Sequence, residues 1–75
     1  MKVIRIGNSI VSLENVREVE IQKLGTGAQR NPRISRIIVS YQAQCEHTSV
    51  NIDDTDGYPK GENCMTQIFQ ILSRD

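Results

Sequence analysis

The sequence predicts an α+β fold, an antiparallel meander of four to five strands with one C-terminal amphipathic helix packed on the sheet. Residues 2–52 contain short β-branched runs in which apolar and polar residues alternate as in strands. Turn-forming Gly, Asn and Pro separate these runs. Residues 61–74 then change to a helical period. Strands followed by one helix favour a helix that covers one face of the sheet.

Two short strands are expected at residues 2–6 and 9–13, because Gly7-Asn8 can adopt the positive φ values of a two-residue hairpin turn. After them Ser12 can cap a turn whose Leu13 and Val16 both point inward. This stretch is too short for a stable helix, so we expect one helical turn that acts as a corner.

A third strand is expected at residues 17–24, with Val19 and Ile21 on one face and the acids Glu18 and Glu20 on the other. Residues 25–33 follow it with two Gly, one Pro and no large apolar side chain. We predict a flexible loop there.

The run from residue 34 to 43 is the most apolar of the chain and predicts the central strand. Ile37, Val39 and Tyr41 share one face, whereas Ile34 and Ile38 share the other. A turn near residues 42–45 leads to a last strand at about residues 46–52.

The helix is predicted at residues 61–74. Its apolar side chains fall within an arc of roughly 160° on a helical wheel and would face the sheet. They are Cys64, Met65, Ile68, Phe69, Ile71 and Leu72.

The chain has 75 residues, with nine Lys and Arg against nine Asp and Glu. We expect a single small domain over residues 1–75, because a chain of this size buries only about 60% of its extended surface. Zero net charge gives no general argument for a nucleic-acid or polybasic membrane surface, and it eases association between copies.

A cytoplasmic location is expected. Arg5 and Gly7 interrupt the first apolar run, which therefore does not read as a secretory signal. No stretch approaches the roughly 18 apolar residues of a membrane span. Cys45 and Cys64 are then interpreted as reduced thiols.

A Cys45, His47 and Cys64 trio holds enough ligands for zinc with an open fourth position, but close pairs of the Cys-x-x-Cys type are missing. We expect Cys64 in the core and His47 on the surface. We predict neither a metal nor a cofactor.

Two loops contain fragments of known binding motifs. The acidic run at residues 53–57 resembles part of a calcium loop, but it lacks the first ligand and the final Glu. The Gly25-Thr26-Gly27 segment lacks the Gly-Lys-Ser/Thr of a phosphate loop. Both are interpreted as solvated turns.

One local basic patch runs from residue 23 to 36 without an acid. It offers an anionic ligand or a nucleic acid the four side chains Lys23, Arg30, Arg33 and Arg36. The chain has few aromatic residues on which bases could stack, so this is the alternative function.

We do not expect an enzyme. The acids lie on polar faces or loops, and His47 has no carboxylate partner on its own strand face.

Residues 10–20, residues 37–41 and the closing helix look like small uncharacterised bacterial or phage proteins with a meander and a C-terminal helix. The arrangement is also similar to a reduced pleckstrin-homology-like unit. It has fewer strands than a complete domain of that kind, so the resemblance implies no phosphoinositide-binding residue here.

The function expected from the sequence is a protein-interaction module that associates with itself, as a dimer. One helix covers one sheet face only, which leaves Ile34 and Ile38 on the other face as an apolar strip for a second copy.

Overall fold

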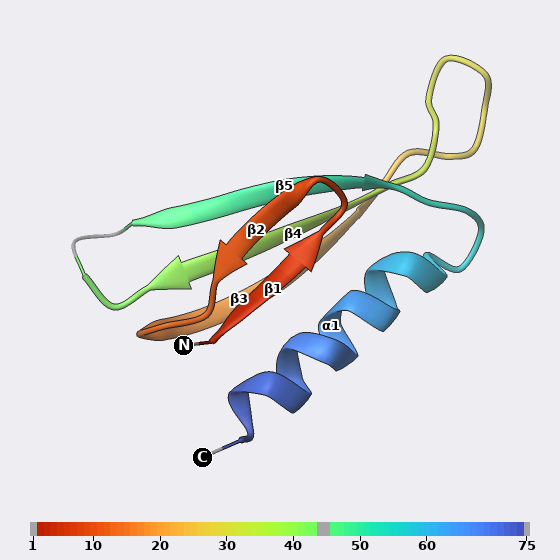
Figure 1. Cartoon of the computed structure of the whole chain (residues 1–75). Helices are drawn as coiled ribbons and strands as arrows, with labels where there is room; N and C mark the ends of the chain where they lie inside the picture. Colours follow the sequence, from red (N-terminus) through yellow and green to blue (C-terminus); the bar gives the residue numbers. More distant parts are fainter. Residues whose placement is uncertain (1, 44–45, 75) are drawn as a thin grey trace.

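The computed structural model describes residues 2–43 and 46–74. Strands pair antiparallel in two sheets, β1-β2 and β3-β4-β5, and one C-terminal helix packs against β4, which confirms the predicted α+β class (Figure 1). In chain order the elements are β1 (Val3–Ile6), β2 (Ser9–Ser12), β3 (Val16–Leu24), β4 (Ile34–Tyr41), β5 (His47–Asp53) and α1 (Pro59–Leu72).

The β1-β2 hairpin forms a sheet of its own and does not continue the meander into β3. The reason is the corner before β3, where Asn15 adopts a left-handed conformation with φ 57° and redirects the chain. The corner is a tight turn, not the predicted turn of helix. The Ser12 hydroxyl accepts a hydrogen bond from the Glu14 amide at 3.2 Å, so Ser12 does cap this turn.

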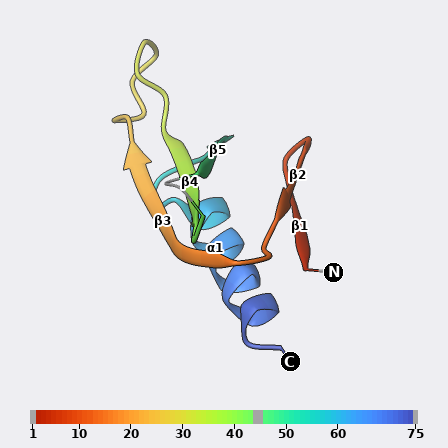
Figure 2. The ribbon, with the colours of Figure 1, turned by 90° about the vertical axis from the view of Figure 1, so that its left-hand side faces the viewer.

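The hairpin and α1 lie on the same side of the three-stranded sheet (Figure 2). Together they enclose the core, to which all three parts contribute. Its buried apolar residues are Ile4, Ile6, Val11, Leu13, Ile37, Val39, Cys64 and Ile68.

β4 is the central strand, as predicted, and pairs with β3 on one side and β5 on the other. In this register Ile37 lies between Ile21 and Val50, and all three point toward the core. The ladder with β3 shifts between Val16 and Glu18, which marks a β-bulge at the start of β3.

The helix begins and ends two residues earlier than the predicted range 61–74. Pro59 occupies its first turn, where a missing N–H costs nothing. The Ser73 hydroxyl donates to the carbonyl of Phe69 at 2.8 Å just beyond the last residue. Arg74 therefore follows the helix and does not belong to its last turn.

The loop at residues 25–33 extends past the end of the sheet (Figure 1) and has a hydrogen-bonded turn of its own. The amides of Thr26 and Gly27 donate to the carbonyl of Asn31 at 3.1 and 3.0 Å. Gly25 has φ +86°, and a Cβ there would lie 2.7 Å from the carbonyl carbon of Pro32, so only glycine fits. The flexibility of this loop stays a prediction.

No helix in residues 2–43 and 46–74 has the length and apolarity that crossing a membrane requires.

Candidate functional site

An open groove of about 250 Å³ lies between the first half of β3 and the second half of α1. Residues 16–19 of β3 form one wall. The other wall is formed by the helix side chains Met65, Ile68, Phe69 and Leu72. The groove is thus bounded by a strand on one side and by mostly apolar side chains on the other.

Phe69 departs from the helical-wheel prediction, because 72% of its surface is exposed. The helix turns Gly61, Cys64 and Ile68 toward the sheet. Phe69 lies about 100° around the wheel from Ile68 and therefore reaches past the side of the contact. A large aromatic ring is left at the mouth of the groove.

The edge of β3 that borders this groove is unpaired within the described residues. In the described residues β3 pairs with β4 alone, and the other edge of β4 pairs with β5. From Glu18 to Leu24 the strand is regular, because its bulge lies at the start. This edge therefore presents backbone N–H and C=O groups that no strand pairs, and its first residues, 16–19, border the apolar wall.

The same edge carries Glu18 and Glu20 on the face of the sheet that points away from α1. They lie opposite Ser40 and Ile38 of β4, whereas the intervening Val19 lies opposite the buried Val39. In the part of the chain that the structure describes, neither carboxylate has a cation within ion-pair distance. Their negative charge is available to a neighbour at this edge.

Two other hollows are less suited to a ligand. One of about 160 Å³ between the β1-β2 turn and the start of α1 is edged by polar side chains such as Arg5, Lys60 and Gln67. The other, of about 380 Å³, lies between the loop and residues 54–56, where Arg33 and Asp56 already form an ion pair at 3.6 Å. Of these three hollows within the described residues, the β3–α1 groove has the most apolar lining, and it borders an unpaired strand edge.

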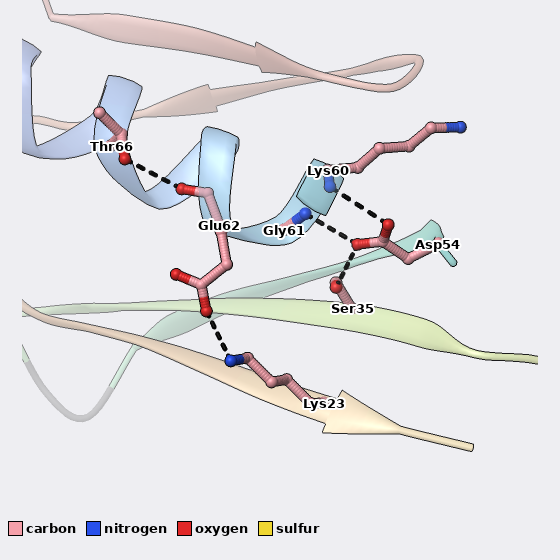
Figure 3. A network of polar contacts seen from close by, with 7 residues as sticks. All are labelled: Lys23, Ser35, Asp54, Lys60, Gly61, Glu62 and Thr66. Atoms are coloured by element: carbon pink, nitrogen blue, oxygen red, sulfur yellow. Dashed lines mark hydrogen bonds and ion pairs between the residues drawn. The ribbon is translucent and has the colours of Figure 1, made fainter. Parts of the chain in front are cut away.

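The predicted basic patch is not one surface. Lys23 lies on the helix side of the sheet and pairs with Glu62 at 2.6 Å (Figure 3). Arg36 lies on the opposite side, where it donates to Asn51 at 3.1 Å and to Gln22 at 3.4 Å. Arg33 pairs with Asp56, and Arg30 is exposed in the loop. The four residues proposed as an anion contact are therefore divided between two faces and a loop.

The basic segment 23–36 and the acidic segment 53–62 are adjacent in space. Both ion pairs among the described residues join them, and the Asp54 amide donates to the carbonyl of Arg33 at 2.9 Å. Two of the four basic side chains of the first segment, Lys23 and Arg33, thus pair with acids of the second.

Ile34 and Ile38 lie on the uncovered face of the sheet, as predicted, but they do not form a continuous apolar strip. Arg36 stands between them on β4. Across the ladder, Ile38 faces Glu20 and Ser49, while Ile34 faces Leu24 and Asp53. Alternation along β3 and β5 brings mainly polar side chains to this face.

His47 and Cys64, two members of the weighed metal trio, lie on opposite sides of the sheet. His47 pairs with Ser40 and is exposed on the uncovered face, whereas Cys64 is buried beneath α1. Burial raises the pKa of the Cys64 thiol, which keeps it protonated and a poor ligand. Cys45, the third member, lies outside the described residues.

Asp54, from the run that resembles a calcium loop, accepts four hydrogen bonds. One carboxylate oxygen accepts the Ser35 hydroxyl at 2.7 Å and the Gly61 amide at 2.8 Å. The other accepts the amides of Thr55 at 2.9 Å and Lys60 at 3.1 Å. Figure 3 shows how this carboxylate joins the buried Ser35 of β4 to the first turn of α1.

Partial desolvation raises the pKa of Asp54, but the bonds from Ser35, Gly61, Thr55 and Lys60 outweigh it and lower the pKa to about 2. The carboxylate is therefore ionised at neutral pH and fixes where the helix begins. The sequence shows that Asp54 lies shortly before the helix, but it does not show that Ser35 is a hydrogen-bond partner of its carboxylate.

No family model matches the chain, and neither a curated protein nor a solved structure is similar to it. The resemblance to a reduced pleckstrin-homology-like unit stays a prediction.

Proposed function

We propose that this chain is a non-enzymatic protein-interaction module that binds an extended segment of a partner protein in the β3–α1 groove. The observation that carries the proposal is the free edge of β3 directly beside the apolar wall that ends in the exposed Phe69.

An extended segment suits this site for two reasons. Its backbone can pair with the unpaired N–H and C=O groups of β3 and so add a fourth strand to the sheet. Every second side chain of such a strand would then point toward α1, where Met65, Phe69 and Leu72 offer apolar surface.

The non-enzymatic part of the proposal is supported by the two described groups whose pKa is most displaced. Asp54 is held ionised by four donors, so it is neither a general acid nor an available base at neutral pH. Cys64 is buried and its raised pKa disfavours the nucleophilic thiolate.

A Phe69→Ser variant tests the site, with Ile10→Ser as its matched control. Both substitutions remove an exposed apolar side chain, since Phe69 is 72% and Ile10 75% exposed, but Ile10 lies on the hairpin away from the groove. The probe is a library of extended peptides displayed on phage and selected on the wild-type protein.

We expect the selected peptides to lose at least about tenfold in affinity on Phe69→Ser, and to bind Ile10→Ser as they bind wild type. Equal binding to all three proteins would place the contact elsewhere. A library that yields no binder would also count against the proposal.

Self-association stays a separate prediction that concerns another surface. Light scattering at micromolar concentration measures it, and an Ile34→Ser/Ile38→Ser variant should convert any dimer to monomer if that face is the contact. A dimer that persists in this variant but disappears in Phe69→Ser would assign the groove to a second copy.

A further inference from the structure

From the two glutamates on the β3 edge we infer that the partner segment alternates apolar and basic residues. This inference rests on the proposed function and specifies the chemistry of the segment that the groove accepts.

A strand added at the edge of β3 has one face toward α1 and one face toward the uncovered side of the sheet. On the helix face its neighbours on β3 are Val19 and Ile21, with Met65 and Phe69 beyond them. Apolar side chains are therefore favoured at every second position of the segment.

On the other face the neighbours of the added strand are Glu18 and Glu20. Side chains directly opposite each other on adjacent strands lie close enough to interact, and opposite charges there are favourable. Neither glutamate has an ion-pair partner within residues 2–43 and 46–74, so a Lys or Arg of the segment does not compete with an internal cation.

On this face Arg36 lies opposite Gln22 across the ladder and is held by other groups. It donates to Asn51 at 3.1 Å and to Gln22 at 3.4 Å, and Gln22 in turn donates to Glu20 at 3.5 Å. Arg36 therefore reaches Glu20 only through Gln22. Two negative charges on one edge disfavour an acidic strand and favour a basic one.

Two synthetic eight-residue peptides with blocked ends test the inference, one alternating Val and Lys and the other alternating Val and Glu. We expect the wild-type protein to bind the Val/Lys peptide about tenfold or more tightly than the Val/Glu peptide in low salt. The difference should shrink as ionic strength rises, because both carboxylates are exposed.

A Glu18→Lys/Glu20→Lys variant should reverse this preference. Its control is Glu46→Lys/Asp53→Lys, which changes the net charge by the same amount near the opposite edge of the sheet, and which should retain the wild-type preference. When hydrogen exchange is measured with the peptide bound, the β3 amides that point away from β4 should become protected.

The possible failures are distinguishable. Equal binding of both peptides, with loss on Phe69→Ser, would overturn the charge rule and leave the groove as the site. A preference that Glu46→Lys/Asp53→Lys also reverses would show that net charge alone decides. If neither peptide binds and the phage library yields no binder, the proposed function itself fails.

Discussion

The buried hydroxyl of Ser35 donates a hydrogen bond of 2.7 Å to the carboxylate of Asp54 and thereby joins the central strand to the segment that starts α1. The same carboxylate oxygen accepts the Gly61 amide at 2.8 Å. One side chain thus satisfies a buried hydroxyl and an amide of the first helical turn, two groups that would be costly to leave unpaired.

Acid should remove the contribution of Asp54 to stability. Its pKa is about 2 in the folded chain and 3.8 as an ordinary carboxyl, so the unfolded chain takes up the proton first. The contribution is complete above pH 3.8 and is lost as the pH falls through about 2. Urea unfolding between pH 6 and pH 2 measures this loss of stability. Asp54→Asn should be less stable than wild type at pH 6, and its stability should fall less as the pH is lowered. A variant that declines as steeply as wild type would contradict the role given to Asp54.

Gly61→Ala should destabilise the protein, although Ala normally stabilises a helix relative to Gly by about 1 kcal/mol. A Cβ at this position would lie 2.6 Å from the Cβ of Ser35 and 2.8 Å from the Cδ1 of Ile21. We expect a loss of about 1–3 kcal/mol in the free energy of unfolding. Thr66→Ala, on the exposed side of the same helix, is the control and should change stability by less than about 1 kcal/mol.

Two tyrosines should tie down two different segments. The Tyr58 hydroxyl lies 3.0 Å from the carbonyls of both Leu24 and Gly25 at the base of the loop, whereas the Tyr41 hydroxyl donates to Ser12 of the hairpin at 2.6 Å. Each Tyr→Phe change should cost about 1 kcal/mol. Amide hydrogen exchange should become faster in residues 25–33 for Tyr58→Phe and in residues 2–13 for Tyr41→Phe. The same pattern in both variants would refute separate anchoring.

The Cys64 thiol should resist alkylation in the folded protein. It is buried and its pKa is raised, so little thiolate is present and reagents cannot reach it. In a Cys45→Ser background, iodoacetamide labelling followed by mass spectrometry should be at least about tenfold slower for folded than for urea-unfolded protein. Equal rates would mean that α1 leaves the sheet readily.

Local signals in the sequence were sufficient for the strands and the helix, although not for the corner before the third strand. Gly7-Asn8 between two β-branched runs predicts the first hairpin, and the change of period after Gly61 predicts the helix. The helix begins two residues before the predicted position, and there Asp54, outside the helix, accepts the Gly61 amide of the first turn. That bond depends on Ser35, which is distant along the chain.

The candidate site was only partly predictable. The sequence places Glu18 and Glu20 on a wet face of their strand, but periodicity does not reveal that this strand is an edge. Phe69 belongs to the apolar arc of the helical wheel. It is nevertheless exposed, because the contact between the helix and the sheet is narrower than this arc. Conversely, the basic run at residues 23–36 is one patch in the sequence, but in the fold Lys23 and Arg36 lie on opposite faces of the sheet.

By itself the sequence determined the α+β class, a count of four to five strands, the helix and the central place of residues 34–41. These follow from short-range alternation, which a linear chain displays directly. Only the tertiary structure decided that the hairpin leaves the meander at Asn15, that two ion pairs join the basic and acidic segments, and that a free strand edge borders an apolar groove. These features depend on contacts between residues that are distant in the sequence. The packing of the hairpin and the helix on one face of the sheet determines those contacts.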